Sequence, residues 1–155
     1  WREKRKAKKT DELKLAALQR TLKAPPVFGD PQGDLLVIGW GSTQGAIEEA
    51  VEALRAKGKK VSSMHLRFLQ PLPPGIKQVM QRFKKVVTIE GNWSDRPEDE
   101  IIDETNRRYS ALAMMLRSRY LIDVDCWSEV RGQPIKPGVV LRVISEKLKR
   151  KDGLT

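Results

Sequence analysis

The hydrophobic positions of this chain fall into short apolar runs that alternate with segments of helical periodicity. Residues 35–40 (LLVIGW) form a continuous apolar run, which is typical of a strand buried on both faces of a sheet. Later apolar runs also predict strands, at residues 61–69, 86–89 and 121–127. In the first of these later runs Met64, Leu66 and Phe68 alternate with polar residues, so they are expected to share one face.

The segments between these runs repeat their apolar residues every three or four positions, as amphipathic helices do. This spacing predicts helices at residues 46–57, 76–83, 111–119 and 139–151, and a charged helix at residues 1–23. Proline ends the first helix at Pro25-Pro26. Another helix is predicted to begin at Pro97 and to run through Ile102, because the acidic residues after Pro97 suit the positive N-terminal end of a helix.

The order of these elements is typical of a parallel sheet whose strands are joined by right-handed helical crossovers. We therefore expect an α/β fold: a three-layer α/β/α domain with a mostly parallel sheet of about five strands. Residues 1–33 are expected to form a charged helical arm and linker, and residues 34–155 the domain itself.

The charge is concentrated at the two ends of the chain. The 155 residues include 30 Lys and Arg and 20 Asp and Glu, a net charge of +10. Residues 1–24 hold nine Lys and Arg against three Asp and Glu, whereas the middle of the chain is nearly neutral. This distribution favours a cationic arm over a basic groove, so nucleic acid is an unlikely partner, although a nucleic-acid-binding module that uses the arm stays an alternative.

The chain begins at Trp1 and has no apolar run that could serve as a signal peptide or a membrane span, so we expect a piece of a larger protein with no membrane partner. Cys126 is the single cysteine, which excludes an internal disulfide and indicates a reducing, cytoplasmic compartment. Its place in an apolar run beside Trp127 favours a buried, inert thiol.

A glycine-rich turn follows the first apolar strand, with Gly39, Gly41, Ser42 and Thr43 before the next helix. Glycines in this place can approach a phosphate at a helix N-terminus. The dinucleotide fingerprint needs a third glycine where Gln44 stands, and it needs an acidic residue after the next strand. The pattern therefore favours a tight strand-to-helix turn capped by Ser42 or Thr43.

No other group of residues completes a catalytic constellation. His65 is expected on the same side of its strand as Ser63 and Arg67. This position favours a structural or interface role for His65 over that of a general base. The acidic residues between 95 and 104 can pair with nearby arginines, so they indicate a solvated face or a docking surface. The residues alone thus predict no catalytic, metal or cofactor-binding residue in this domain.

Two longer segments resemble a known family. Residues 34–51 (DLLVIGWGSTQGAIEEAV) and 61–73 (VSSMHLRFLQPLP) are similar to the transketolase C-terminal-like domain in the α subunit of 2-oxoacid:ferredoxin oxidoreductases. Residues 112–117, 120–124 and 130–137 resemble later parts of the same domain, and residues 25–30 its preceding linker.

The resemblance implies a complex that converts a 2-oxoacid, here more consistent with 2-oxoglutarate than with pyruvate, to its coenzyme A ester. It also implies thiamine diphosphate, magnesium and a [4Fe-4S] cluster elsewhere in that complex, with none bound by this domain. The implied partners are the other domains of the α subunit, the β subunit and ferredoxin. This domain would have a non-catalytic role in assembly, and its last strand would run antiparallel.

One other enzyme class stays an alternative, and one segment of the chain departs from the family pattern. Another transketolase-type thiamine enzyme, such as a 2-oxoacid dehydrogenase β chain, is the nearest rival. The departure is the segment 91–109, which the family lacks, and Ser110-Ala111 stand where the family has Gly-Gln. We expect this extra segment to be a contact surface and Trp93 to be an interface residue. Gly39, Gly41, Ser42, Thr43, His65 and Arg67 are the other candidate interface or turn residues.

Overall fold

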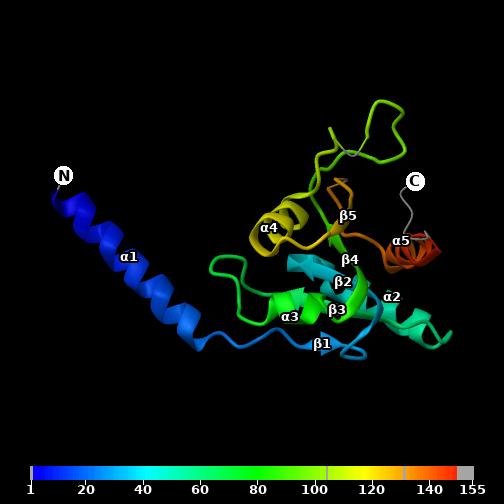
Figure 1. The fold of residues 1–155 in the computed structure, drawn as a ribbon, viewed down its shortest axis with the longest axis horizontal. Coiled ribbons are helices and arrows are strands. Elements are labelled where there is room, and N and C mark those ends of the chain that lie inside the picture. The colour runs from blue at the N-terminus through cyan, green and yellow to red at the C-terminus, as the bar shows by residue number, and fades with distance from the viewer. Residues whose placement is uncertain (1, 104, 131, 150–155) are drawn as a thin grey trace.

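The computed structural model describes residues 2–103, 105–130 and 132–149, which form a five-stranded sheet covered by helices, with a long helical arm (Figure 1). The strands are β1 (Val27–Phe28), β2 (Gly33–Trp40), β3 (Val61–Leu66), β4 (Phe83–Glu90) and β5 (Asp125–Ser128). The α-helices are α1 (Arg2–Thr21), α2 (Gln44–Arg55), α3 (Ile76–Met80), α4 (Ala111–Tyr120) and α5 (Pro137–Lys149), and a short 3-10 helix, η1 (Gly41–Thr43), precedes α2.

The sheet is parallel except at one edge. Its strand order is β1-β3-β2-β4-β5, and β2, β3, β4 and β5 all run in the same direction. The expectation of an antiparallel last strand is wrong, because β5 pairs with β4 in parallel. The antiparallel strand is β1, which pairs with β3 through Val27–Met64 and Phe28–Ser63 and lies inside the predicted linker. The division of the chain at residue 33 stays a prediction.

Alternate residues of the central strand fill two separate cores, which confirms the three-layer α/β/α fold. Leu35 and Val37 of β2 pack with α2 and α5 on one face of the sheet. Leu36 and Ile38 pack with α3 and α4 on the other face. A strand buried on both faces has no polar side, which explains why residues 35–40 are apolar without alternation.

Helix α1 extends away from the body of the domain (Figure 1). Its side chains from residue 10 onward are mostly exposed, including Leu13 and Leu15. Among the described residues, no helix combines the length and the apolar character needed to cross a bilayer.

The segment between β4 and α4 is irregular, so the predicted helix at Pro97 is wrong. Its turn is held by local side-chain bonds: the Asp103 carboxylate accepts hydrogen bonds from the backbone N–H groups of Thr105 and Asn106 at 2.7 and 3.1 Å. Such local bonds compete with helix formation. Two predicted strands are also shorter than expected, since β3 ends at Leu66 and β5 begins only at Asp125.

The glycine-rich turn after β2 is shaped by packing. A Cβ atom on Gly39 would lie 2.4 Å from Cδ1 of Ile47 and 2.6 Å from Oγ1 of Thr43. Gly41 has φ of +61°, which favours glycine. The Thr43 hydroxyl donates back to the carbonyl oxygen of Trp40 at 2.9 Å, and no side chain caps α2, so the predicted cap by Ser42 or Thr43 is wrong.

Substitutions at two glycines of this turn should change stability in opposite directions. Gly39→Ala should lower the free energy of unfolding by about 1–3 kcal/mol, because the new methyl group overlaps Ile47 and Thr43. Gly45→Ala should raise it by about 0.5–1 kcal/mol, because Gly45 lies in α2 with open space around its Cα. Urea unfolding of both variants measures the difference, and equal effects would contradict the packing explanation.

Candidate functional site

The topology places a switch point between β2 and β4. The chain leaves the carboxyl end of β2 through α2 toward β3, and it leaves the neighbouring β4 through α4 toward β5 on the opposite side. In open α/β sheets this crevice, outside the carboxyl ends of the strands, is where ligands usually bind. Trp40 and Glu90 end the two strands at this point.

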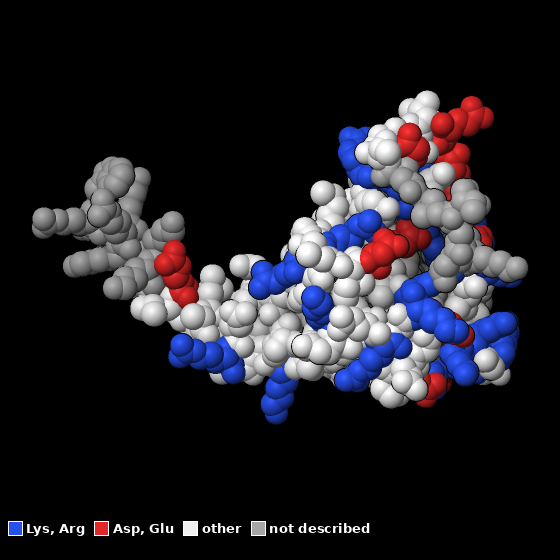
Figure 2. Space-filling model, in the orientation of Figure 1, with Lys and Arg blue, Asp and Glu red and all other residues white. Residues whose placement is uncertain are grey.

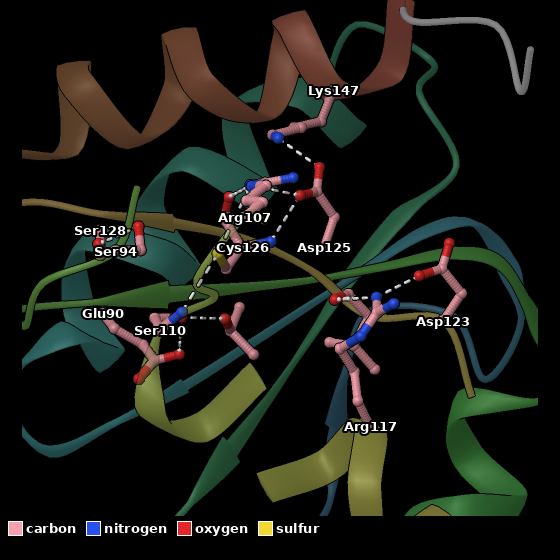
Figure 3. A network of polar contacts seen from close by, with 12 residues as sticks. Glu90, Ser94, Arg107, Ser110, Arg117, Asp123, Asp125, Cys126, Ser128 and Lys147 are labelled. Carbon is pink, nitrogen blue, oxygen red and sulfur yellow. Dashed lines mark hydrogen bonds and ion pairs between the residues drawn. The ribbon is translucent and has the colours of Figure 1, made fainter. Parts of the chain in front are cut away.

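At the end of β4 the side chain of Glu90 points toward Ser110 at the start of α4 (Figure 3). This carboxyl group is fully buried and accepts hydrogen bonds from the backbone N–H groups of Leu112 and Ala113, at 2.9 and 3.2 Å. The Ser110 hydroxyl donates to it as well, and so does the side-chain amide of Asn92 at 2.8 Å. We refer to these contacts as the Glu90 junction.

The Glu90 junction uses the groups that would otherwise bind a phosphate. The first N–H groups of a helix attract anions, because they have no partner within the helix. At α4 two of these groups are already bonded to Glu90, so the chain supplies its own anion there. These two N–H groups therefore take part in an internal structural contact.

The segment that leaves β4 and returns at α4 is fixed at its base by a second carboxylate. Asp95, which is almost fully buried, accepts hydrogen bonds from the backbone and the guanidinium of Arg108, at 2.8 to 3.1 Å. These bonds hold the pKa of Asp95 below its ordinary value. Ser94 and Ser128 also lie 2.6 Å apart between their hydroxyl oxygens. We call residues 91–110 the clamped loop.

The clamped loop protrudes from the domain and carries exposed side chains. The end of the loop displays a group of acidic side chains (Figure 2). At its base the Arg108 guanidinium lies 4.3 Å from the centre of the Trp93 ring, which is 56% exposed. A stacked, exposed tryptophan suits the predicted interface role of Trp93, although that role stays a prediction.

Arg107 joins the clamped loop to the last strand and helix, a contact that sequence analysis missed. Its guanidinium lies 3.0 Å from Asp125 of β5, which also forms an ion pair with Lys147 of α5 (Figure 3). Burial alone would raise the pKa of Asp125, but the two cations outweigh it and lower that pKa. Above pH 3.8, the ordinary pKa of Asp, these ion pairs therefore contribute fully to the stability of the fold. The contribution is lost as the pH falls through the lowered pKa of Asp125, because the carboxylate is then protonated.

Cys126 and Tyr109 are held in the same region. Cys126 is buried, and its sulfur lies 3.4 Å from the backbone nitrogen of Ser110, so its buried position is confirmed. The Tyr109 ring lies 4.5 Å from the guanidinium of Arg107 and 4.2 Å from that of Arg117. The Arg107 guanidinium also contacts Cys126, with its Nη2 atom 3.6 Å from the sulfur.

His65 and Arg67 lie at a different place, beside the linker that follows α1. They line a cavity of about 460 Å³ together with Ser63, as their predicted common side implies. Burial lowers the pKa of His65, Glu48 opposes this effect and Arg67 adds to it. Gly39 pairs with His65 across β2 and β3, whereas Trp93 belongs to the clamped loop, so the candidate residues do not converge on one site.

The described residues offer no ligand set for the metal groups that the resemblance implies for a larger complex. Within the described ranges, no three His, Cys, Asp or Glu side chains lie close enough together to hold a metal ion. The chain has one cysteine, whereas iron–sulfur clusters are held by several cysteine thiolates.

Comparison with known proteins identifies the family. Residues 33–122, more than half of the chain, match the family pyruvate:ferredoxin oxidoreductase core domain II. The chain therefore belongs to this family, and the resemblance of its sequence to 2-oxoacid:ferredoxin oxidoreductases is confirmed.

Two relatives come from very different organisms. The chain is 40% identical over 105 residues to the 2-oxoglutarate oxidoreductase subunit KorA of Mycobacterium tuberculosis. This alignment covers 66% of the chain and 14% of KorA. It is 35% identical over 81 residues to the α subunit of 2-oxoacid:ferredoxin oxidoreductase 1 of Aeropyrum pernix. That alignment covers 50% of the chain and 13% of the subunit. The chain thus spans only a small part of the length of these relatives.

Solved structures confirm the fold. A 2-oxoglutarate:ferredoxin oxidoreductase from Magnetococcus marinus superimposes with a TM-score of 0.71 at 24% identity, over 86% of this chain and 21% of that one. A split-gene transketolase superimposes with a TM-score of 0.52 at 18% identity, over 81% of this chain and 42% of that one. Both structures therefore share the α/β fold of this chain.

Loss of the Asp95 contact should loosen the clamped loop without unfolding the domain. Asp95→Asn removes the charge that holds Arg108, so trypsin should cleave after Arg107 or Arg108 several-fold faster than in the wild type. Asp99→Asn makes the same change of charge at an exposed site in the same loop and should leave the cleavage rate unchanged. Equal cleavage of the wild type and Asp95→Asn would contradict the clamp.

Proposed function

We propose that this chain is a domain of the α subunit of a 2-oxoglutarate:ferredoxin oxidoreductase. The enzyme would oxidatively decarboxylate 2-oxoglutarate to succinyl-coenzyme A and pass the electrons to ferredoxin in the cytoplasm. The observation that carries the proposal is the 40% identity to KorA, whose name specifies 2-oxoglutarate. A branched-chain 2-oxoacid is the second candidate, because the ketoisovalerate oxidoreductase subunit VorA of Pyrococcus furiosus is 28% identical over 91 residues.

Within that enzyme we propose a non-catalytic, assembling role for the domain. The Glu90 junction already bonds the two N–H groups of α4 that could bind a phosphate, which supports a role without a cofactor of its own. Thiamine diphosphate, magnesium and the [4Fe-4S] cluster would belong to other domains and to the β subunit. Residues 1–33 would connect the domain to the rest of the α subunit, and the clamped loop would contact a neighbour through Trp93 and its acidic end.

The proposal predicts which substrate the parent complex oxidises. The complex is purified without oxygen, and reduction of a viologen dye is followed with coenzyme A and 2-oxoglutarate, pyruvate or 2-oxoisovalerate. We expect the largest kcat/KM for 2-oxoglutarate. A preference for another 2-oxoacid would keep the enzyme class and overturn the substrate, whereas a complex without iron–sulfur clusters would overturn the ferredoxin-linked function and favour a 2-oxoacid dehydrogenase.

A further inference from the structure

Two cavities away from the Glu90 junction differ in their balance of charge. The larger, about 750 Å³, lies beside β5 and α5 and is lined by four cationic and four acidic side chains: Arg96, Arg142, Lys147, Lys149, Asp95, Glu98, Glu129 and Glu146. Such a balance selects no class of ligand. The smaller, about 460 Å³, lies between the linker after α1, strand β3 and helix α2, and we call it the linker cavity.

Backbone contacts at both ends of the linker hold the linker cavity in shape. At one end Ala24 approaches the backbone of Gly75 so closely that a Cβ atom on Gly75 would lie 2.8 Å from that of Ala24. At the other end β1 pairs with β3, and the Ser62 hydroxyl donates to the carbonyl oxygen of Asp30 at 2.8 Å. The cavity is therefore built into the fold and does not result from a loosely attached arm.

The polar groups of the linker cavity carry a surplus of positive charge. Arg67 and Lys23 are its cations, and their side chains form no hydrogen bond or ion pair with the described residues. Glu48 is its single acidic lining residue, and one of its oxygens accepts a hydrogen bond from the Gln44 side chain at 2.8 Å. The guanidinium of Arg67 therefore keeps all its donors available, in a planar arrangement that matches a carboxylate or a phosphate.

The other lining residues are largely apolar and enclose a volume suited to a small molecule. They include Leu22, Pro25, Pro26, Val27, Phe28, Phe68 and Pro73. Sites for small ligands have volumes of about 300–1,000 Å³ and combine apolar walls with a few polar groups that fix orientation. His65 supplies one such polar group, and its Nδ1 atom is buried without a hydrogen-bond partner among the described residues.

We infer that the linker cavity binds a small organic anion with an apolar body. Arg67 holds the anionic group, and the prolines and phenylalanines of the linker, together with Phe68 and Pro73 after β3, enclose the apolar body. This site lies apart from the 2-oxoacid chemistry of the proposed enzyme, so its test does not depend on that activity. A phosphate ester and a carboxylate share the recognition by Arg67, whereas free phosphate lacks the apolar body.

The single histidine of the chain gives a direct reporter of the linker cavity. All histidine ring signals in an NMR spectrum of this 155-residue chain come from His65. Phenylacetate should shift these signals saturably, and it should raise the pKa of His65, because a nearby anion favours the charged imidazolium. Phenylacetamide, which is neutral, and inorganic phosphate should bind at least about tenfold more weakly.

A pair of variants assigns the anionic contact. Arg67→Gln should weaken the binding of phenylacetate by at least about tenfold, because it removes the charged donors. Arg82→Gln makes the same change of charge at an exposed residue that does not line the cavity and should leave binding unchanged. The inference is overturned by the absence of saturable binding, by equal binding of phenylacetamide or phosphate, or by equal effects of the two variants.

Discussion

The bond between the Glu90 side chain and the start of α4 is the contact on which the rest of this face depends. Between β4 and α4 the chain leaves the domain through the long clamped loop and returns at Ser110. A buried carboxyl group is tolerated only when donors satisfy it, and here a hydroxyl, a side-chain amide and two backbone N–H groups do so. The junction therefore fixes both ends of the loop and allows its middle to extend outward.

This constraint also gives an internal partner to backbone groups that can bind a phosphate in other α/β folds. The N–H groups of α4 that would attract a phosphate are bonded to Glu90, and the glycines after β2 serve the packing of Gly39 against Ile47. The features left for contact with neighbours are at the periphery: the clamped loop with Trp93, and the linker with its cavity. That distribution is consistent with a domain whose role in a larger enzyme is assembly.

The sequence predicted the elements that follow from local periodicity. The fully apolar run in β2 predicted a strand buried on both faces, and the alternation in β3 correctly placed Met64 and Leu66 in one core. The same alternation was wrong for Phe68, because β3 ends at Leu66 and Phe68 is 41% exposed beside the linker cavity. Strand β1 has only two residues before a glycine turn, too few for a pattern, and the helix expected at Pro97 gave way to the bonds of Asp103. The pairing of Asp95 with a nearby arginine was predicted and is confirmed at Arg108. The contacts of Glu90 with α4 and of Arg107 with β5 were missed, because these partners lie 18 to 23 residues away and are brought near only by the fold.

The most direct measurement is hydrogen exchange at the backbone amides of Leu112 and Ala113 in Glu90→Gln, compared with Glu49→Gln, which removes the same charge from an exposed position on α2. If the Glu90 junction holds α4 to β4, both amides should exchange at least about tenfold faster in Glu90→Gln and at the wild-type rate in Glu49→Gln. Unchanged exchange at these two amides in Glu90→Gln would contradict the account.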